Sequence, residues 1–482
     1  MALLFSTGER YFSLAINFIC IAAVSRLMDP DEIGVSVVGM AIMSMALSAR
    51  EFVSTNYLIQ TPNLSREAVQ SAFTIMALFS LVMAGLLLVF APLIAGIYED
   101  PRLVPYLRVI AVAFLLEVFA APTLALLRRD MAFGRIALIN IVSNGLSTLL
   151  VIVLAVMGFG YMSLAWGWLA ATTMIVASCL IARPEFWIFR LSLARWRTIL
   201  TFGGYNGATL LLQRLYEQMP YLVLGRLLSM HHVAIYSRSI MLCQLPDKII
   251  IGGAGAVVLP AFAAEVRNSG NLKKPYLKAI AIISAIQWPA LCLLAIMARP
   301  AVHLVLGAQW DEVVPLVRII ALAMTFSFGF DLNYPILVSL GAMRDLFLRT
   351  AIIVPVSIAV MCAAALVGLE AVAWSLFLII PFQALVSFHF IRRHIQMEWS
   401  ELGRPLRESL VVAVSSAGAA FLVSRWLPFG PGLDFFRLGL CAGSALAGWL
   451  FGIWLTGHPL GDEIRFLWNR LQAVRGRQIS LG

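Results

Sequence analysis

The chain has 482 residues, of which 61 % are hydrophobic and only 12 % are charged, and its net charge is +10. A soluble domain carries about 45–50 % apolar and about 25 % charged residues, so too little polar surface is present here to cover a soluble globule. Soluble enzymes, disordered chains and fibrous proteins are therefore excluded. A transmembrane β-barrel is excluded as well, because its strands alternate polar and apolar residues, whereas the apolar runs of this chain are continuous. The composition predicts an all-α polytopic membrane protein.

Fourteen apolar stretches are long enough to cross the bilayer, which takes about 20 residues of helix. They are roughly 9–28, 34–58, 72–97, 104–127, 136–158, 162–182, 202–228, 234–262, 278–298, 313–340, 347–368, 371–391, 407–427 and 435–456. Lys and Arg gather in the loops that follow even-numbered spans, whereas the loops at 29–32 and 99–100 are acidic. This distribution predicts that the even-side loops and both termini are cytoplasmic, and it explains the net charge without nucleic acid as a partner.

Six cysteines lie singly in apolar runs, which is typical of small packing residues and not of a disulfide framework or a metal site. Catalytic signatures such as G-x-S-x-G, H-E-x-x-H and the phosphate-binding P-loop do not occur in the sequence. We therefore expect neither an enzyme nor a cofactor. Without an ATP site, transport would be driven by an ion gradient or by the gradient of the substrate.

Two segments recur along the chain. Residues 25–35 match residues 225–235 at an offset of 200, and residues 104–114 match residues 314–324 at an offset of 210. Parallel repeats of this kind suit a transporter with two lobes around a central cavity. The predicted division is a six-helix lobe at 1–184, a basic amphipathic cytoplasmic linker at 185–200, a second six-helix lobe at 201–395, two further helices at 396–456 and a cytoplasmic tail at 457–482.

Charged residues within the spans are informative, because a charge at mid-bilayer costs about 2.5–3.5 kcal/mol. Arg214 and Glu217 stand one helical turn apart in the seventh span and can pair. At the offset of 200, Gln213 aligns with Ser13 and Glu217 aligns with Asn17 of the first span. Either a structural ion pair or the wall of a wet cavity explains the polar residues of the seventh span.

The second and eighth spans also carry charges. Arg50 and Glu51 are neighbours in the second span, and Asp247 and Lys248 follow Pro246 in the eighth. The proline predicts a bend, and bent helices are places where charges meet ligands in transporters. A packed Asp–Lys pair is the simpler alternative.

Two further acids stand alone in their spans. Glu117 lies in the fourth span and Asp331 in the tenth. Each is either a proton or sodium site or a hydrogen-bonded core acid.

Five short motifs resemble those of one exporter family. They are RLMDPDEIG at 26–34, LIQ at 58–60, LPDK at 245–248, VLPAF at 258–262 and LGAQW at 306–310, the last leading into Pro315. In this order they resemble the polysaccharide transporter branch of the multidrug/oligosaccharidyl-lipid/polysaccharide exporter superfamily, to which Wzx-type O-antigen and exopolysaccharide flippases and lipopolysaccharide exporters belong. The resemblance covers about residues 10–395.

The resemblance implies a flippase that moves a polyprenyl-diphosphate-linked oligosaccharide across a bacterial inner membrane by alternating access. A diphosphate prefers Arg, whose planar fork binds its oxygens in pairs. The expected cavity residues are Arg50, Arg214, Glu217, Gln213, Asn17 and Lys248, and the expected sites for a coupling Na⁺ or H⁺ are Glu51, Asp247, Asp331 and Glu117. The expected partners are the lipid-linked glycan, membrane lipids, and polysaccharide polymerisation or export machinery. A multidrug or small-solute exporter of the same fold and a membrane glycan polymerase or ligase are the alternatives.

Overall fold

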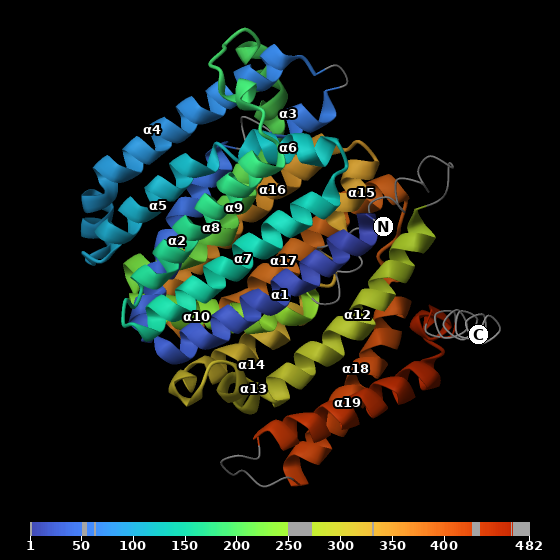
Figure 1. The fold of residues 1–482 in the computed structure, drawn as a ribbon. Helices are drawn as coiled ribbons and strands as arrows, with labels where there is room; N and C mark the ends of the chain where they lie inside the picture. Colours follow the sequence, from blue (N-terminus) through green and yellow to red (C-terminus); the bar gives the residue numbers. More distant parts are fainter. Residues whose placement is uncertain are drawn as a thin grey trace, which may run out of the picture. The chain divides into compact units, whose positions relative to one another are not determined.

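The computed structural model describes residues 2–50, 55–61, 64–248, 272–329, 332–426, 434–463 and 465. Every regular element within these ranges is helical (Figure 1). Contacts divide the chain into two compact units, the first comprising Met1–Ser237 and Val354–Leu369, and the second Arg238–Ile353 and Glu370–Gly482. The predicted division into two six-helix lobes follows the sequence repeat and stays a prediction.

The first part of the chain forms long helices joined by short turns. The helices are α1 (Ala2–Leu27), α2 (Pro30–Arg50), α3 (Thr55–Gln60), α4 (Arg66–Tyr98), α5 (Leu103–Glu117), α6 (Ala121–Arg129), α7 (Phe133–Val156), α8 (Met162–Ala182), the 3-10 helix η1 (Phe186–Phe189), α9 (Trp196–Leu227) and α10 (Met230–Cys243). Local chemistry sets their ends. The Ser65 hydroxyl accepts the Ala68 N–H at the start of α4, and Glu99 ends that helix in the left-handed region with φ 56°.

In the first unit α1 lies along α7, α7 along α8, and α5 packs against both α4 and α8 (Figure 1). Met43, Tyr106, Phe114 and Ala165 are buried together at the meeting of α2, α5 and α8. Many large apolar side chains on the outer faces of α4 and α7 are exposed. Exposed apolar side chains of this kind are expected on helices that face lipid, because they contact hydrocarbon and not water.

Within the first unit, α2 lies close to the end of α9 and the start of α10. A Cβ on Gly34 would collide with the carbonyl group of Met230, and a Cβ on Gly225 would lie 2.9 Å from the Val38 Cγ2 atom. Arg226 adds an ion pair across the same region, with its Nη1 atom 3.1 Å from Glu99 Oε1. Glycine is required where two backbones come this near.

The second part of the chain is again helical. Its elements are α12 (Lys273–Ile296), α13 (Ala298–Val305), η2 (Ala308–Trp310), α14 (Val313–Met324), η3 (Thr325–Ser327), α15 (Asn333–Ser339), α16 (Met343–Ala365), α17 (Leu369–Ile395), α18 (Ser400–Trp426) and α19 (Asp434–Thr456). In the second unit α12 packs on α14 and α18, and α18 packs on α19. Gly448 and Gly452 of α19 lie directly on Ser415 of α18, which is the close packing that small residues permit in membranes.

The residues after α19 bind back onto the second unit through His458. Its Nδ1 atom accepts the Leu460 N–H at 3.1 Å, and its Nε2 atom lies 3.3 Å from the Ser409 hydroxyl. Ser409 is in turn 2.8 Å from the Ser284 hydroxyl of α12. This contact ties α12, α18 and the segment after α19 together.

Each predicted span overlaps at least one helix, which confirms an all-α polytopic membrane fold. By length and hydropathy, ten of the described helices qualify as spans, and there are eleven if α5 and α6, bent by 44°, are counted as one broken span. The count of fourteen stays a prediction. Three predicted spans account for the difference. The seventh corresponds to α9, which carries several charged residues. The eighth, at 234–262, lies partly outside the described residues, and the tenth is broken into α14, η3 and α15.

Candidate functional site

The polar residues of the seventh predicted span form one connected group on α9. Arg214 Nη1 donates to Glu217 Oε2 at 2.7 Å, and Gln213 Nε2 donates to Glu217 Oε1 at 3.1 Å. The predicted Arg214–Glu217 pairing is therefore confirmed. The Arg214 side chain is 52 % exposed and that of Glu217 is 36 % exposed. The group is a half-exposed strip of charge in the middle of a long helix, and Arg214 retains further N–H groups that could reach a ligand.

A second group joins the ends of α2 and α5. Arg50, the last residue of α2, donates from Nη2 to Glu117 Oε1 at 2.9 Å and stacks over the Phe114 ring at 5.3 Å. Glu117 was predicted to be either a proton or sodium site or a hydrogen-bonded core acid, and this bond is what the second alternative expects. Arg50 is 8 % exposed. Its Nη1 atom and Glu117 Oε2 are both buried without a hydrogen-bond partner among the described residues, so the pair keeps one donor and one acceptor for a further group.

The second unit holds a third polar group, centred on a glutamine that sequence reasoning did not select. Gln287 of α12 is fully buried, and its Nε2 atom donates to Asp247 Oδ1 at 2.6 Å and to Ser327 Oγ at 3.0 Å. Gln287 Oε1 has no partner within the part of the chain that the structure describes. Gln287 is a polar residue inside an apolar run, and this is the signal that could have identified it.

The remaining predicted residues are placed as follows. Asn17 is exposed on α1, and Lys248 is exposed beyond α10. Ser13, one turn before Asn17, lies 3.5 Å from the Asn144 amide of α7. Glu51 and Asp331 lie outside the described residues. The predicted set is thus distributed over several polar groups.

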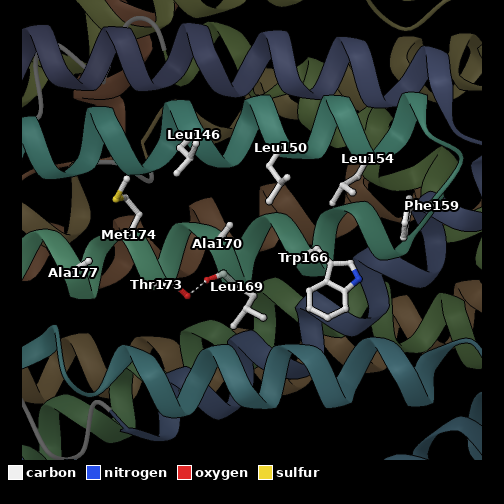
Figure 2. A pocket seen from close by; sticks show the side chains of 10 residues that line it. All are labelled: Leu146, Leu150, Leu154, Phe159, Trp166, Leu169, Ala170, Thr173, Met174 and Ala177. Atoms are coloured by element: carbon white, nitrogen blue, oxygen red, sulfur yellow. Dashed lines mark hydrogen bonds between the residues drawn. The ribbon is translucent and has the colours of Figure 1, made fainter.

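A groove of about 570 Å³ runs along the faces of α7 and α8. Figure 2 shows Leu146, Leu150 and Leu154 of α7 opposite Trp166 and Met174 of α8. The one hydroxyl in its lining, that of Thr173, donates to its own helix at the Leu169 carbonyl oxygen, 2.8 Å away. None of the predicted site residues lines this groove. Its chemistry suits a hydrocarbon chain and cannot hold a glycan or a diphosphate.

Comparison with known proteins identifies the group to which these features correspond. A family model described as "Polysaccharide biosynthesis protein" matches residues 23–315. The succinoglycan biosynthesis transport protein ExoT of Rhizobium meliloti is 22 % identical over 314 residues, covering 64 % of this chain and 63 % of ExoT. The lipopolysaccharide biosynthesis protein WzxC of Escherichia coli K12 is 22 % identical over 312 residues, with the same coverage of 64 % and 63 %. Each match thus spans less than two thirds of the relative.

A solved structure with a similar fold is the lipid II flippase MurJ in an inward closed conformation. It aligns with a TM-score of 0.77 and 12 % identity, covering 92 % of this chain and 97 % of MurJ. At this identity the likeness shows the fold. Together the matches confirm the resemblance that the five sequence motifs carried.

Proposed function

This chain belongs to the polysaccharide biosynthesis protein family, and on that premise we propose that it is a flippase for a polyprenyl-diphosphate-linked oligosaccharide. Glycan and diphosphate cannot cross hydrocarbon unaided, because burying unpaired polar groups and charges is costly. A protein must offer them a wet, polar path while the polyprenyl tail stays in lipid. The names of ExoT and WzxC, which describe polysaccharide transport and biosynthesis, support this substrate class.

The proposed location is a bacterial inner membrane with both termini in the cytoplasm. The support is the excess of Lys and Arg in alternate loops, which sets orientation in multi-pass proteins. The substrate is then loaded on the cytoplasmic side, moved by alternating access, and released outside to polymerisation or export machinery. A coupling Na⁺ or H⁺ would bind at Asp247 or Glu117, the two acids among the four predicted that the structure describes.

The observation that carries the proposal is the half-exposed Arg214 on α9. A charge that faced lipid at this depth would cost about 2.5–3.5 kcal/mol, so its exposed surface is better explained by a wet path. Glu217 holds the guanidinium from one side at 2.7 Å. The free edge of the guanidinium can then bind two oxygens of a diphosphate at once.

The test compares Arg214→Ala and Arg214→Lys with Arg226→Ala in proteoliposomes. Arg226 is the matched control, because it lies on the same helix, is also 52 % exposed and also pairs with an acid. The substrate is a polyprenyl diphosphate that carries a fluorescent oligosaccharide, and an impermeant glycosidase reports its appearance on the far side. We expect Arg214→Ala to abolish flipping, Arg214→Lys to flip weakly because it loses the two-pronged contact, and Arg226→Ala to stay near wild type.

Flipping by Arg214→Ala at the wild-type rate, with equal protein in the vesicles, would remove Arg214 from the substrate path. Efflux of organic cations by the wild-type chain, without movement of the labelled glycolipid, would instead assign it to the multidrug exporters. A purely structural role of the ion pair predicts a different pattern: low protein levels for Arg214→Ala, restored when Glu217 is also made apolar.

A further inference from the structure

The segment between α8 and α9 is fixed to the first unit. Ile188 of η1 is buried in a core cluster together with residues of α4. The Trp187 carbonyl oxygen accepts from Gln70 Nε2 at 3.0 Å, and the Ser192 N–H donates to Thr74 Oγ1 at 2.8 Å. The segment was predicted as a linker over 185–200, but α9 begins at Trp196. These contacts hold the segment at one depth along α4.

The other side of this segment exposes large apolar side chains. Phe186, Leu191, Leu193 and Trp196 are between 45 % and 77 % exposed. They lie between the predicted spans at 162–182 and 202–228, so we expect them where water and lipid head groups meet. Burying such apolar side chains at the boundary between head groups and acyl chains is favourable, because it removes them from water.

Arginines alternate with these apolar residues. Arg190 and Arg195 are exposed, and neither side chain has a hydrogen bond or ion pair with any residue that the structure describes. The nearby carboxylate of Glu185 does not balance them, because it is bound by Arg183 Nε at 2.7 Å. The segment therefore presents two uncompensated positive charges beside a row of exposed apolar side chains.

We propose that this linker surface, comprising Phe186, Arg190, Leu191, Leu193, Arg195 and Trp196, is a binding site for anionic phospholipid of the surrounding leaflet. The arginines bind the phosphodiester oxygens, and the apolar side chains lie against the upper acyl chains. A soluble phosphate would use the arginines but not the apolar row, and a zwitterionic lipid would leave the charge unneutralised. The proposal is independent of the transported substrate.

The expected preference can be estimated from the charges. A basic residue near an anionic membrane surface contributes about fivefold in affinity. Arg190 and Arg195 together should therefore favour phosphatidylglycerol over phosphatidylethanolamine by about 25-fold. Leu191 and Leu193 should contribute to the binding of both lipids alike, because they contact hydrocarbon and not the head group.

The test is native mass spectrometry of the full chain, purified in detergent, delipidated and titrated with each lipid. The charge variant is Arg190→Ser/Arg195→Ser, and the apolar variant is Leu191→Ser/Leu193→Ser. The matched control is Arg344→Ser/Arg393→Ser, which removes two exposed arginines of the second unit that also have no partner among the described residues. All six positions are exposed, so the variants should fold, and a melting curve for each one checks this.

We expect the charge variant to lose the preference for phosphatidylglycerol, the apolar variant to bind both lipids about tenfold more weakly, and the control to match wild type. An unchanged preference in the charge variant, or an equal loss in the control, would overturn the proposal. Displacement of phosphatidylglycerol by millimolar inorganic phosphate would also overturn it, since the site would then recognise phosphate alone. Displacement by undecaprenyl diphosphate at equal concentration would assign the surface to the substrate instead.

Discussion

Removing Arg50 should destabilise the first unit, because its guanidinium is buried in an ion pair. The guanidinium is 8 % exposed, bonds Glu117 at 2.9 Å and stacks on Phe114. Arg50→Ala leaves the Glu117 carboxylate without its ion-pair partner. The other carboxylate oxygen, Oε2, is already buried with no hydrogen-bond partner among the described residues. Loss of one partner from a buried ion pair costs about 3–5 kcal/mol. Glu117 is 31 % exposed, so we expect the lower end of that range.

A loss of about 3 kcal/mol corresponds to a fall in melting temperature of about 6–12 °C for a unit of this size. Size-exclusion chromatography of heated, detergent-solubilised protein measures that fall. The double variant Arg50→Met/Glu117→Leu should recover most of it, because replacing a whole buried pair by apolar residues is often tolerated. Melting temperatures that fall additively, with the double variant worse than either single variant, would refute the argument that the pair is coupled.

Three further predictions concern other parts of the molecule. Burial lowers the pKa of His458 below its usual 6.5, and the charge of Glu408 opposes this shift. The neutral ring therefore stabilises the folded state above about pH 6.5. This stability is lost as the pH falls through the lower pKa of the folded state. Melting curves from about pH 8 to about pH 5 should show this loss in wild type and a flatter profile in His458→Gln. Gly34→Ala should lower the melting temperature by forcing α2 from the start of α10, whereas Gly145→Ala, with open space at its Cβ, should not. Gln287→Leu should destabilise the second unit by removing a hydrogen bond from Asp247, and equal melting of Gln287→Leu and wild type would contradict this.

The sequence predicted the features that depend on local spacing. The membrane class and the positions of the spans follow from continuous apolar runs, and the Arg214–Glu217 pair follows from a separation of one helical turn. The Arg50–Glu117 pair joins residues 67 positions apart. Neither its existence nor the stacking on Phe114 can be derived from spacing, because both depend on where the ends of α2 and α5 meet.

The same limit applies to Gln287 and to the linker surface. The sequence predicted a basic amphipathic linker at 185–200, but burial of Ile188 against α4 is a tertiary contact that no local pattern indicates. The broken helix at α14, η3 and α15 was predicted as one span for a related reason. Hydropathy averages over about 20 residues, so it cannot detect a short change from α-helix to 3-10 helix within an apolar run.

The contact of α2 with the end of α9 and the start of α10 bears on how such a chain can evolve. Gly34 belongs to one copy of the repeated sequence at 25–35, and Gly225 and Met230 belong to the other at 225–235. The two copies therefore face each other, as equivalent patches do in a twofold homodimer, but within one polypeptide. A symmetric dimer changes both sides of its interface with every mutation. Here each side can mutate alone, so the junction is free to become asymmetric.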